Sequence, residues 1–78
     1  MAMRVHLGSN LSWYDPEKRS WLVIAQPAPI PLLDLVRTLG VPAAEIAVAV
    51  VNGQAIELET GVATDDDEVE FFPPLGGG

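Results

Sequence analysis

The chain has 78 residues, 49% of them hydrophobic, and a formal net charge of −7 at pH 7. This length fits one small domain, and the hydrophobic content is too high for a disordered chain. The chain contains no cysteine and only one histidine, His6, which excludes disulfides, thiol catalysis and metal sites built on several cysteines or histidines. Binding to nucleic acid depends on positive charge, so the 4 basic against 11 acidic residues argue against that partner.

The sequence also shows no segment that is typical of a membrane span or a signal peptide. Its longest apolar run, residues 46–51, is far shorter than the roughly 20 residues that a spanning helix needs. The N-terminus leads into an alternating pattern without an apolar signal segment. We therefore expect a soluble, cytoplasmic protein that binds neither membranes nor nucleic acid. Its negative charge favours basic protein surfaces as partners.

The first part of the chain predicts two strands joined by a polar loop. Residues 3–7 alternate between apolar and polar side chains, which is typical of a half-buried strand. Residues 11–20 are polar and contain the turn signal Asp15-Pro16. Residues 21–25 are rich in β-forming residue types, so we expect them to pair with the first strand as a wide hairpin.

A single helix is predicted after a proline-rich stop. Pro31 fits the first position of this helix, where no backbone donor is missed. Gly40 supplies a left-handed stop, and Pro42 prevents continuation. Apolar residues at helical spacing form one stripe on the segment between them: Leu32, Leu35, Val36 and Leu39.

The remaining elements are three strands. The strongest local signal among them is the hairpin turn Asn52-Gly53. The chain order is a short turn over residues 43–45, strands over 46–51 and 54–58, a loop over 60–67, and a final strand over 68–72. The sequence thus predicts an α+β fold of ββαβββ order, with one main helix packed on a mixed sheet of four or five strands.

The C-terminus is the main candidate for a functional group. The last three residues, Gly76-Gly77-Gly78, form a thin segment without side chains that ends in a carboxylate. The rest of the sequence supplies no catalytic base, metal site or phosphate-binding loop, so catalysis must belong to a partner. A frayed end or a cloning remnant is the alternative interpretation.

Several residues next to this end are candidates for partner contact. If Val69 and Phe71 point toward the helix, strand alternation places Phe72 on the open face of the sheet; the reversed register is the alternative. We expect Phe72, Pro73 and Pro74 to contact a partner, and Leu75 to enter a partner pocket. The apolar strand over 46–51 predicts either an open docking face, formed by Ala47, Ala49 and Val51 or by their neighbours, or a central strand.

The other polar and aromatic features have simpler interpretations. The acidic residues between positions 65 and 70 are expected to form a solvated loop, or a surface complementary to a basic enzyme, because their spacing matches no calcium loop. Asp66 is compatible with a left-handed turn. His6 is expected to be an exposed side chain. Trp13 and Tyr14 are expected to fold back over the edge of the sheet, with an aromatic contact to a partner as the alternative.

Residues 67–78, Asp-Glu-Val-Glu-Phe-Phe-Pro-Pro-Leu-Gly-Gly-Gly, resemble the end of small sulfur-carrier proteins of the MoaD/ThiS family. The likeness is strongest to the small subunit of molybdopterin synthase, and the thiamin-pathway carriers look similar. The turn at Asn52-Gly53 and the stretch over 39–42 are also similar to that superfamily. Gly76 departs from the pattern, because many relatives carry a side chain there. The element order is similar to that of ubiquitin-like β-grasp domains.

The resemblance implies a β-grasp domain over residues 1–73 and a flexible tail over residues 74–78. It further implies that a ubiquitin-activating-type adenylyltransferase uses ATP to adenylate Gly78, and that a persulfide donor supplies the sulfur of a thiocarboxylate. Leu75, Gly76 and Gly77 would then thread the active site of an acceptor, the large subunit of molybdopterin synthase.

The carrier itself would bind no cofactor and would be a protein cosubstrate, not an enzyme. Sulfur supply for thiamin thiazole synthesis, conjugation to other proteins through Gly78, and an interaction module with an idle tail remain open as alternatives.

Overall fold

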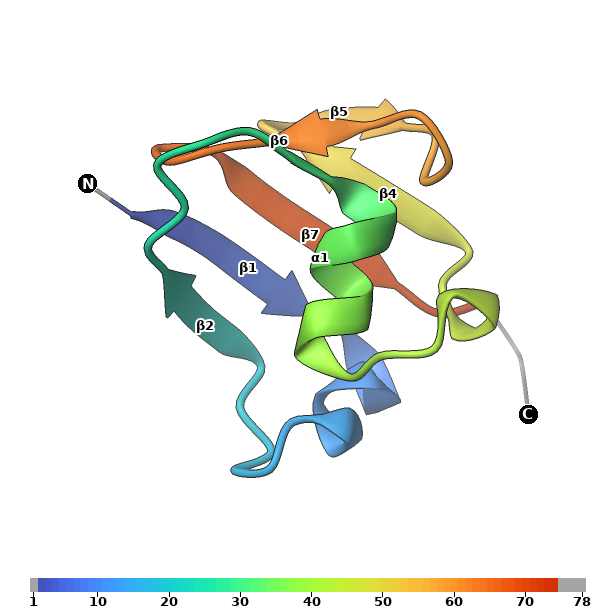
Figure 1. Ribbon diagram of the computed structural model, residues 1–78. Coiled ribbons are helices and arrows are strands. Elements are labelled where there is room, and N and C mark those ends of the chain that lie inside the picture. The colour runs from blue at the N-terminus through green and yellow to red at the C-terminus, as the bar shows by residue number, and fades with distance from the viewer. Residues whose placement is uncertain (1, 75–78) are drawn as a thin grey trace.

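The computed structural model describes residues 2–74 and shows a mixed five-stranded sheet with a helix across one face (Figure 1). The strand order is β2-β1-β7-β4-β5, and a separate pair of short strands joins β3 to β6. The predicted α+β fold and the five-stranded alternative are thereby confirmed. The element bounds are β1 Met3–Leu7, η1 Ser9–Tyr14 (a 3₁₀ helix), β2 Trp21–Ile24, β3 Ile30–Pro31, α1 Leu32–Leu39, η2 Ala43–Glu45 (3₁₀), β4 Val48–Val51, β5 Gln54–Ile56, β6 Val62–Ala63 and β7 Glu68–Phe72.

The last strand, β7, occupies the centre of the sheet. It pairs in parallel with β1 and antiparallel with β4, while β1–β2 and β4–β5 are antiparallel pairs. The core lies between this sheet and α1. In β7, Val69 and Phe71 are fully buried, and strand alternation turns Phe72 to the opposite face. The predicted register of this strand is therefore confirmed. The helix contributes the predicted stripe, of which Leu32, Leu35 and Val36 are buried.

The turns follow the local sequence signals closely. Asn52 and Gly53 both have positive φ angles, 51° and 83°, as a two-residue hairpin of the favoured type requires. Gly40 ends the helix in the left-handed conformation with φ 79°, and the Val41 N–H donates to the Val36 carbonyl at 3.0 Å. Asp66 also adopts a positive φ, 73°, in agreement with the expectation from its residue type.

The start of the helix differs from the prediction. Pro31 is extended, with φ −60° and ψ 141°, and it precedes the helix, which begins at Leu32. The cause is the short β3–β6 pair, in which Pro31 lies opposite Val62. Val62 belongs to the segment over residues 60–67, which was predicted as a loop. The Leu32 N–H donates to the Gly61 carbonyl at 2.9 Å, which fixes this junction. A segment distant in the sequence, Gly61 and Val62, thus determines where the helix starts.

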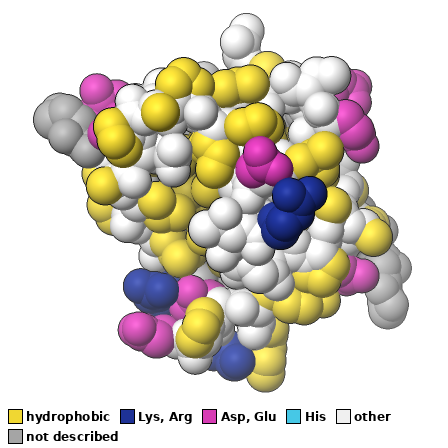
Figure 2. All heavy atoms as spheres, in the orientation of Figure 1, with side chains coloured by type: hydrophobic (Ala, Val, Ile, Leu, Met, Phe, Trp, Pro, Cys, Tyr) yellow, Lys and Arg dark blue, Asp and Glu magenta, His cyan; other side chains and the backbone are white. Residues whose placement is uncertain are grey.

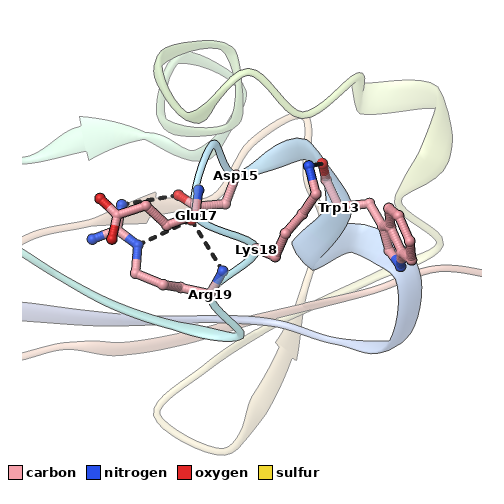
Figure 3. A network of polar contacts seen from close by, with 5 residues as sticks. All are labelled: Trp13, Asp15, Glu17, Lys18 and Arg19. Carbon is pink, nitrogen blue, oxygen red and sulfur yellow. Dashed lines mark hydrogen bonds and ion pairs between the residues drawn. The ribbon is translucent and has the colours of Figure 1, made fainter.

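The loop between β1 and β2 is more ordered than its polar sequence predicts. Leu11, a residue of η1, is buried. The Asp15 carboxylate accepts four hydrogen bonds of 2.9 or 3.0 Å, from the Glu17 N–H, the Arg19 N–H and two guanidinium nitrogens of Arg19 (Figure 3). The Arg19 guanidinium and these backbone donors hold the pKa of Asp15 well below its usual range. The loop is therefore closed by one carboxylate.

Replacing Asp15 with asparagine should destabilise the domain near neutral pH and have much less effect in acid. Because the pKa of Asp15 is lowered on folding, its contribution is complete above the unfolded value of about 3.9 and is lost as the pH falls toward the lower folded value. Thermal unfolding of both proteins near neutral pH and below about pH 4 measures this difference. Glu17→Gln is the control, because Glu17 contributes its backbone N–H to the network. An Asp15→Asn effect of equal size in acid would contradict the prediction.

Trp13 and Tyr14 do not fold back over the sheet edge. The side chain of Trp13 is 70% exposed and that of Tyr14 41% exposed. The Lys18 ammonium lies 5.7 Å from the centre of the Trp13 ring and donates to the Trp13 carbonyl at 3.2 Å (Figure 3). This cation–π contact holds the ring outward, so the expectation was wrong.

None of the helices in the described part of the chain has the length and apolar character needed to cross a membrane.

Candidate functional site

The end of β7 forms a fixed base for the C-terminal segment. The Gly8 N–H donates to the Phe71 carbonyl at 2.9 Å, and the Ala47 N–H donates to the Phe72 carbonyl at 2.8 Å. Pro73 is half-buried and Pro74 is exposed. Because proline has no N–H, these residues end the pairing of the strand. The tail residues Leu75, Gly76, Gly77 and Gly78 lie outside the described residues, so their predicted roles and the boundary of the tail stay predictions.

Three aromatic rings form a row on the open face beside this base. The rings of His6 and Trp21 are stacked with centroids 4.7 Å apart, and the rings of His6 and Phe72 meet in a T-shaped arrangement with centroids 5.7 Å apart. A Cβ atom on Gly8 would lie 2.7 Å from Phe72 Cδ1, so the absence of a side chain at Gly8 leaves the space that Phe72 occupies. We call Trp21, His6 and Phe72 the aromatic row.

The position of His6 was only partly predicted. It lies on the open face, but its side chain is only 23% exposed, and its Nδ1 atom has no hydrogen-bond partner among the described residues. The nearest carboxylate oxygen, Glu70 Oε2, is 3.6 Å from Nδ1. The stacking follows from the strand order, which places β2 on one side of β1 and β7 on the other. No pattern within residues 3–7 could have indicated it.

Charged and aliphatic side chains surround the aromatic row. Arg4 pairs with Glu68 and lies 5.6 Å from the centre of the Trp21 ring. On β2, Val23 is 72% exposed, and on β4, Val48 lies opposite Phe72 in the register and is 44% exposed. The row and these valines place apolar side chains on the open face next to charged ones, a combination that is typical of surfaces that contact other proteins.

The apolar strand at residues 46–51 combines the two predicted possibilities. Ala49 is buried on the helix side, and Val51 packs against the core on that same side. Their neighbours Val48 and Val50 lie on the open face, opposite Phe72 and Glu70. The strand is internal to the sheet, between β7 and β5, and still contributes two valines to the open face. Ala47, just before β4, is exposed.

The acidic cluster forms an ordered loop and not simply a solvated one. Asp65 accepts the Gln26 N–H at 2.6 Å, and Asp67 accepts the Thr64 N–H at 2.8 Å and the Asn52 side-chain amide at 2.9 Å. These bonds tie the loop to two other segments. Within residues 2–74, no three histidine, cysteine or acidic side chains come together in a group that could hold a metal ion.

Comparison with protein-family models shows to which family the chain belongs. The family model of the ThiS family matches residues 19–78. The chain belongs to the ThiS family. A sequence comparison with curated proteins finds no match. Among solved structures, the fold is similar to the crystal structure of SAMP1 from Haloferax volcanii, with a TM-score of 0.65 and 22% identity over 100% of both chains.

The predicted family and fold are thereby confirmed. The sheet and helix form a ubiquitin-like β-grasp, which is the fold that this ThiS-family chain shares with SAMP1. It is a small ubiquitin-like protein of the ThiS/MoaD type, a sulfur carrier or modifier. Such proteins are generally not catalytic, and membership implies partner enzymes that activate them and accept what they carry.

Proposed function

We propose that this ThiS-family protein is a sulfur carrier for the synthesis of molybdopterin, the organic part of molybdenum and tungsten cofactors. The observation that carries this proposal is the segment Phe71-Phe72-Pro73-Pro74. In the structure it buries one phenylalanine in the core, places the other in the aromatic row and then ends the sheet. In the sequence it is followed by Leu75 and the terminal glycines, and it resembles the end of the small subunit of molybdopterin synthase.

The reactive group in this proposal is the α-carboxylate of Gly78. With a reference pKa of about 3.3–3.7, it is ionised at neutral pH and can attack the α-phosphorus of ATP, which releases pyrophosphate and forms an acyl-adenylate. Persulfide sulfur then attacks the acyl carbon, and AMP leaves. A thiol then attacks the donor-side sulfur of the resulting acyl disulfide, which releases the thiocarboxylate and leaves a disulfide on the donor side.

Partner enzymes supply the chemistry, and the carrier supplies a tail that fits. ATP and the persulfide belong to these partners, and the chain binds no cofactor of its own in this account. Glycine at positions 76–78 presents no Cβ, so the backbone can lie close to the nucleotide and adopt conformations that other residues avoid. The aromatic row lies at the base of the tail, where a docked adenylyltransferase or acceptor subunit would contact it.

Phe72→Ala should weaken binding of the adenylyltransferase by roughly tenfold or more, as expected when an aromatic anchor near the centre of an interface is removed. Isothermal titration calorimetry with the purified enzyme measures the dissociation constant. Val62→Ala is the control, because Val62 is also apolar and exposed but lies on β6, outside the five-stranded sheet. Equal affinity of the Phe72→Ala protein and the wild type would contradict a role of the aromatic row in docking.

Sulfur transfer from the isolated thiocarboxylate form tests the assignment of the acceptor. The protein is incubated in parallel with the large subunit of molybdopterin synthase and its pterin precursor, and with a thiazole synthase and its substrates. We expect a dithiolene-containing pterin in the first reaction and return of the carrier to its carboxylate form. Transfer only in the thiazole reaction, or isopeptide-linked adducts in cells without free thiocarboxylate, would contradict the proposal.

A further inference from the structure

We propose that a groove beside the end of β7 binds a peptide segment of a partner protein, one that combines an aliphatic side chain with flanking lysine or arginine. The groove is open and has a volume of about 570 Å³. One wall is formed by η2 and the start of β4, and the other by β5 and the turn that follows it. The lining residues are Ala43, Ala44, Ile46, Ala47, Val48, Ala49, Ala55, Ile56, Glu57, Leu58 and Glu59.

The size and the lining of the groove favour an aliphatic occupant. Helix α1 has only eight residues, and it crosses the middle of the sheet and ends before η2 (Figure 1). Five alanines in the lining fill little space, so the two walls remain apart. Ile46, Ile56 and Leu58 are only partly buried against the core and are present in the lining. An aliphatic side chain placed there would remove apolar surface on both sides from water.

The charge of the groove favours a basic occupant. Among the described residues, the charged ones that line it are Glu57 and Glu59, and both are exposed. In residues 2–74 the three arginines pair with Glu68, Asp15 and Asp34, and the one lysine lies over Trp13. Figure 2 shows no lysine or arginine side chain along the upper part of the drawn face, where β5 lies in Figure 1. Cations on the partner would therefore find carboxylates that the described part of the chain does not neutralise.

The groove lies next to the end of β7, from which the tail continues. Ala47 lines the groove and also donates its N–H to the carbonyl of Phe72 at 2.8 Å. A protein that takes up the tail is thereby brought against the groove as well. The identification of the partner as such an enzyme rests on the proposed function, whereas peptide binding by the groove does not. The groove and the aromatic row would then be two separate contact sites for the partner near the end of β7.

Nuclear magnetic resonance of the ¹⁵N-labelled full chain tests the groove directly. The probe is a blocked lysine-leucine-valine-leucine-lysine peptide, and the matched probes replace its lysines with glutamates or its apolar residues with serines. We expect saturable amide shifts confined to residues 43–49 and 55–59, with affinity at least about tenfold weaker for both matched probes. Shifts centred on the aromatic row, or equal affinity for the lysine and glutamate peptides, would overturn the proposal.

Variants in which the charge is reversed provide a second, independent test of the groove. Glu57→Lys combined with Glu59→Lys should weaken binding of the lysine peptide by about tenfold, while Glu17→Lys, a charge reversal in the β1–β2 loop, should leave it unchanged. Amide spectra of each variant establish that it is folded. A chain without Gly77 and Gly78 should bind the peptide as the wild type does, so failure of groove binding and failure of sulfur loading are distinguishable. Unchanged affinity of the double variant would overturn the proposal.

Discussion

Removal of Gly77 and Gly78 should leave the domain folded and abolish its adenylation. The core, the sheet and the aromatic row that the structure describes within residues 2–74 end at Phe72, and a glycine has no side chain to add to a core. Without them the carboxylate ends two residues, or roughly 7 Å of extended chain, short of its normal position, and precise placement of reacting atoms is a large part of catalysis. ATP–pyrophosphate exchange catalysed by the adenylyltransferase should fall to background. Thermal unfolding should be unchanged.

A single added methyl group provides a graded control for this deletion. Gly78→Ala keeps the length of the chain and the terminal carboxylate but adds a Cβ where the backbone must approach the nucleotide closely. We expect this variant to retain exchange activity at a rate between those of the wild type and the deletion. Exchange by the deletion variant at the wild-type rate would contradict a role for the terminus and favour an interaction module with an idle tail.

Phe71→Ala should have the largest effect on stability and leave little folded protein. Phe71 is fully buried in the central strand and lies opposite Ala49 in the register of β4. Truncation of a buried phenylalanine typically costs about 3–5 kcal/mol, through lost burial and the cavity left behind. A domain of this size is held by a free energy of unfolding near the lower end of about 5–15 kcal/mol. Denaturant unfolding followed by circular dichroism measures the loss.

The adjacent phenylalanine supplies a matched control for this experiment. Phe72→Ala removes the same number of atoms one position later, on the open face, where the ring is only half-buried. We expect a clearly smaller loss of stability, since less surface returns to water and no closed cavity forms. Equal losses for the two variants would mean that the two faces of β7 are not as different as the structure describes.

Most secondary structure could be predicted because its signals are local. The apolar stripe on residues 32–39 and the left-handed stop at Gly40 act within one helix. They predicted the extent of the helix and the residue at which it ends. The turn at Asn52-Gly53 needs only two residues with positive φ. In β7, alternation alone placed Val69 and Phe71 inside and Phe72 outside. In each case the physical determinant lies within a few residues of the element that it shapes.

The features that could not be predicted depend on partners distant in the sequence. The extension of Pro31 requires Val62 across a short antiparallel pair. The stacking of His6 requires strands on both sides of β1. The groove requires η2 and the turn after β5 to face each other, and neither segment carries a motif that indicates the other.

The candidate site was predictable in the part that sequence resemblance covers. Residues 67–78 indicated the family, and the match over residues 19–78 confirms it. The proposed docking surface could be recognised only from the structure, because the aromatic row joins Trp21, His6 and Phe72 from three strands. The ordered acidic loop also needed it, since the acceptor roles of Asp65 and Asp67 follow from contacts with residues far along the chain.

Intact-mass spectrometry of the full chain tests the central claim most directly. The protein is incubated with the adenylyltransferase, ATP and a persulfide or sulfide source, and the C-terminal peptide is then fragmented. The account predicts the exchange of one oxygen atom for one sulfur atom, located at Gly78. An unchanged mass in the presence of an adenylyltransferase that is active on this chain in pyrophosphate exchange, or sulfur at any other position, would contradict it.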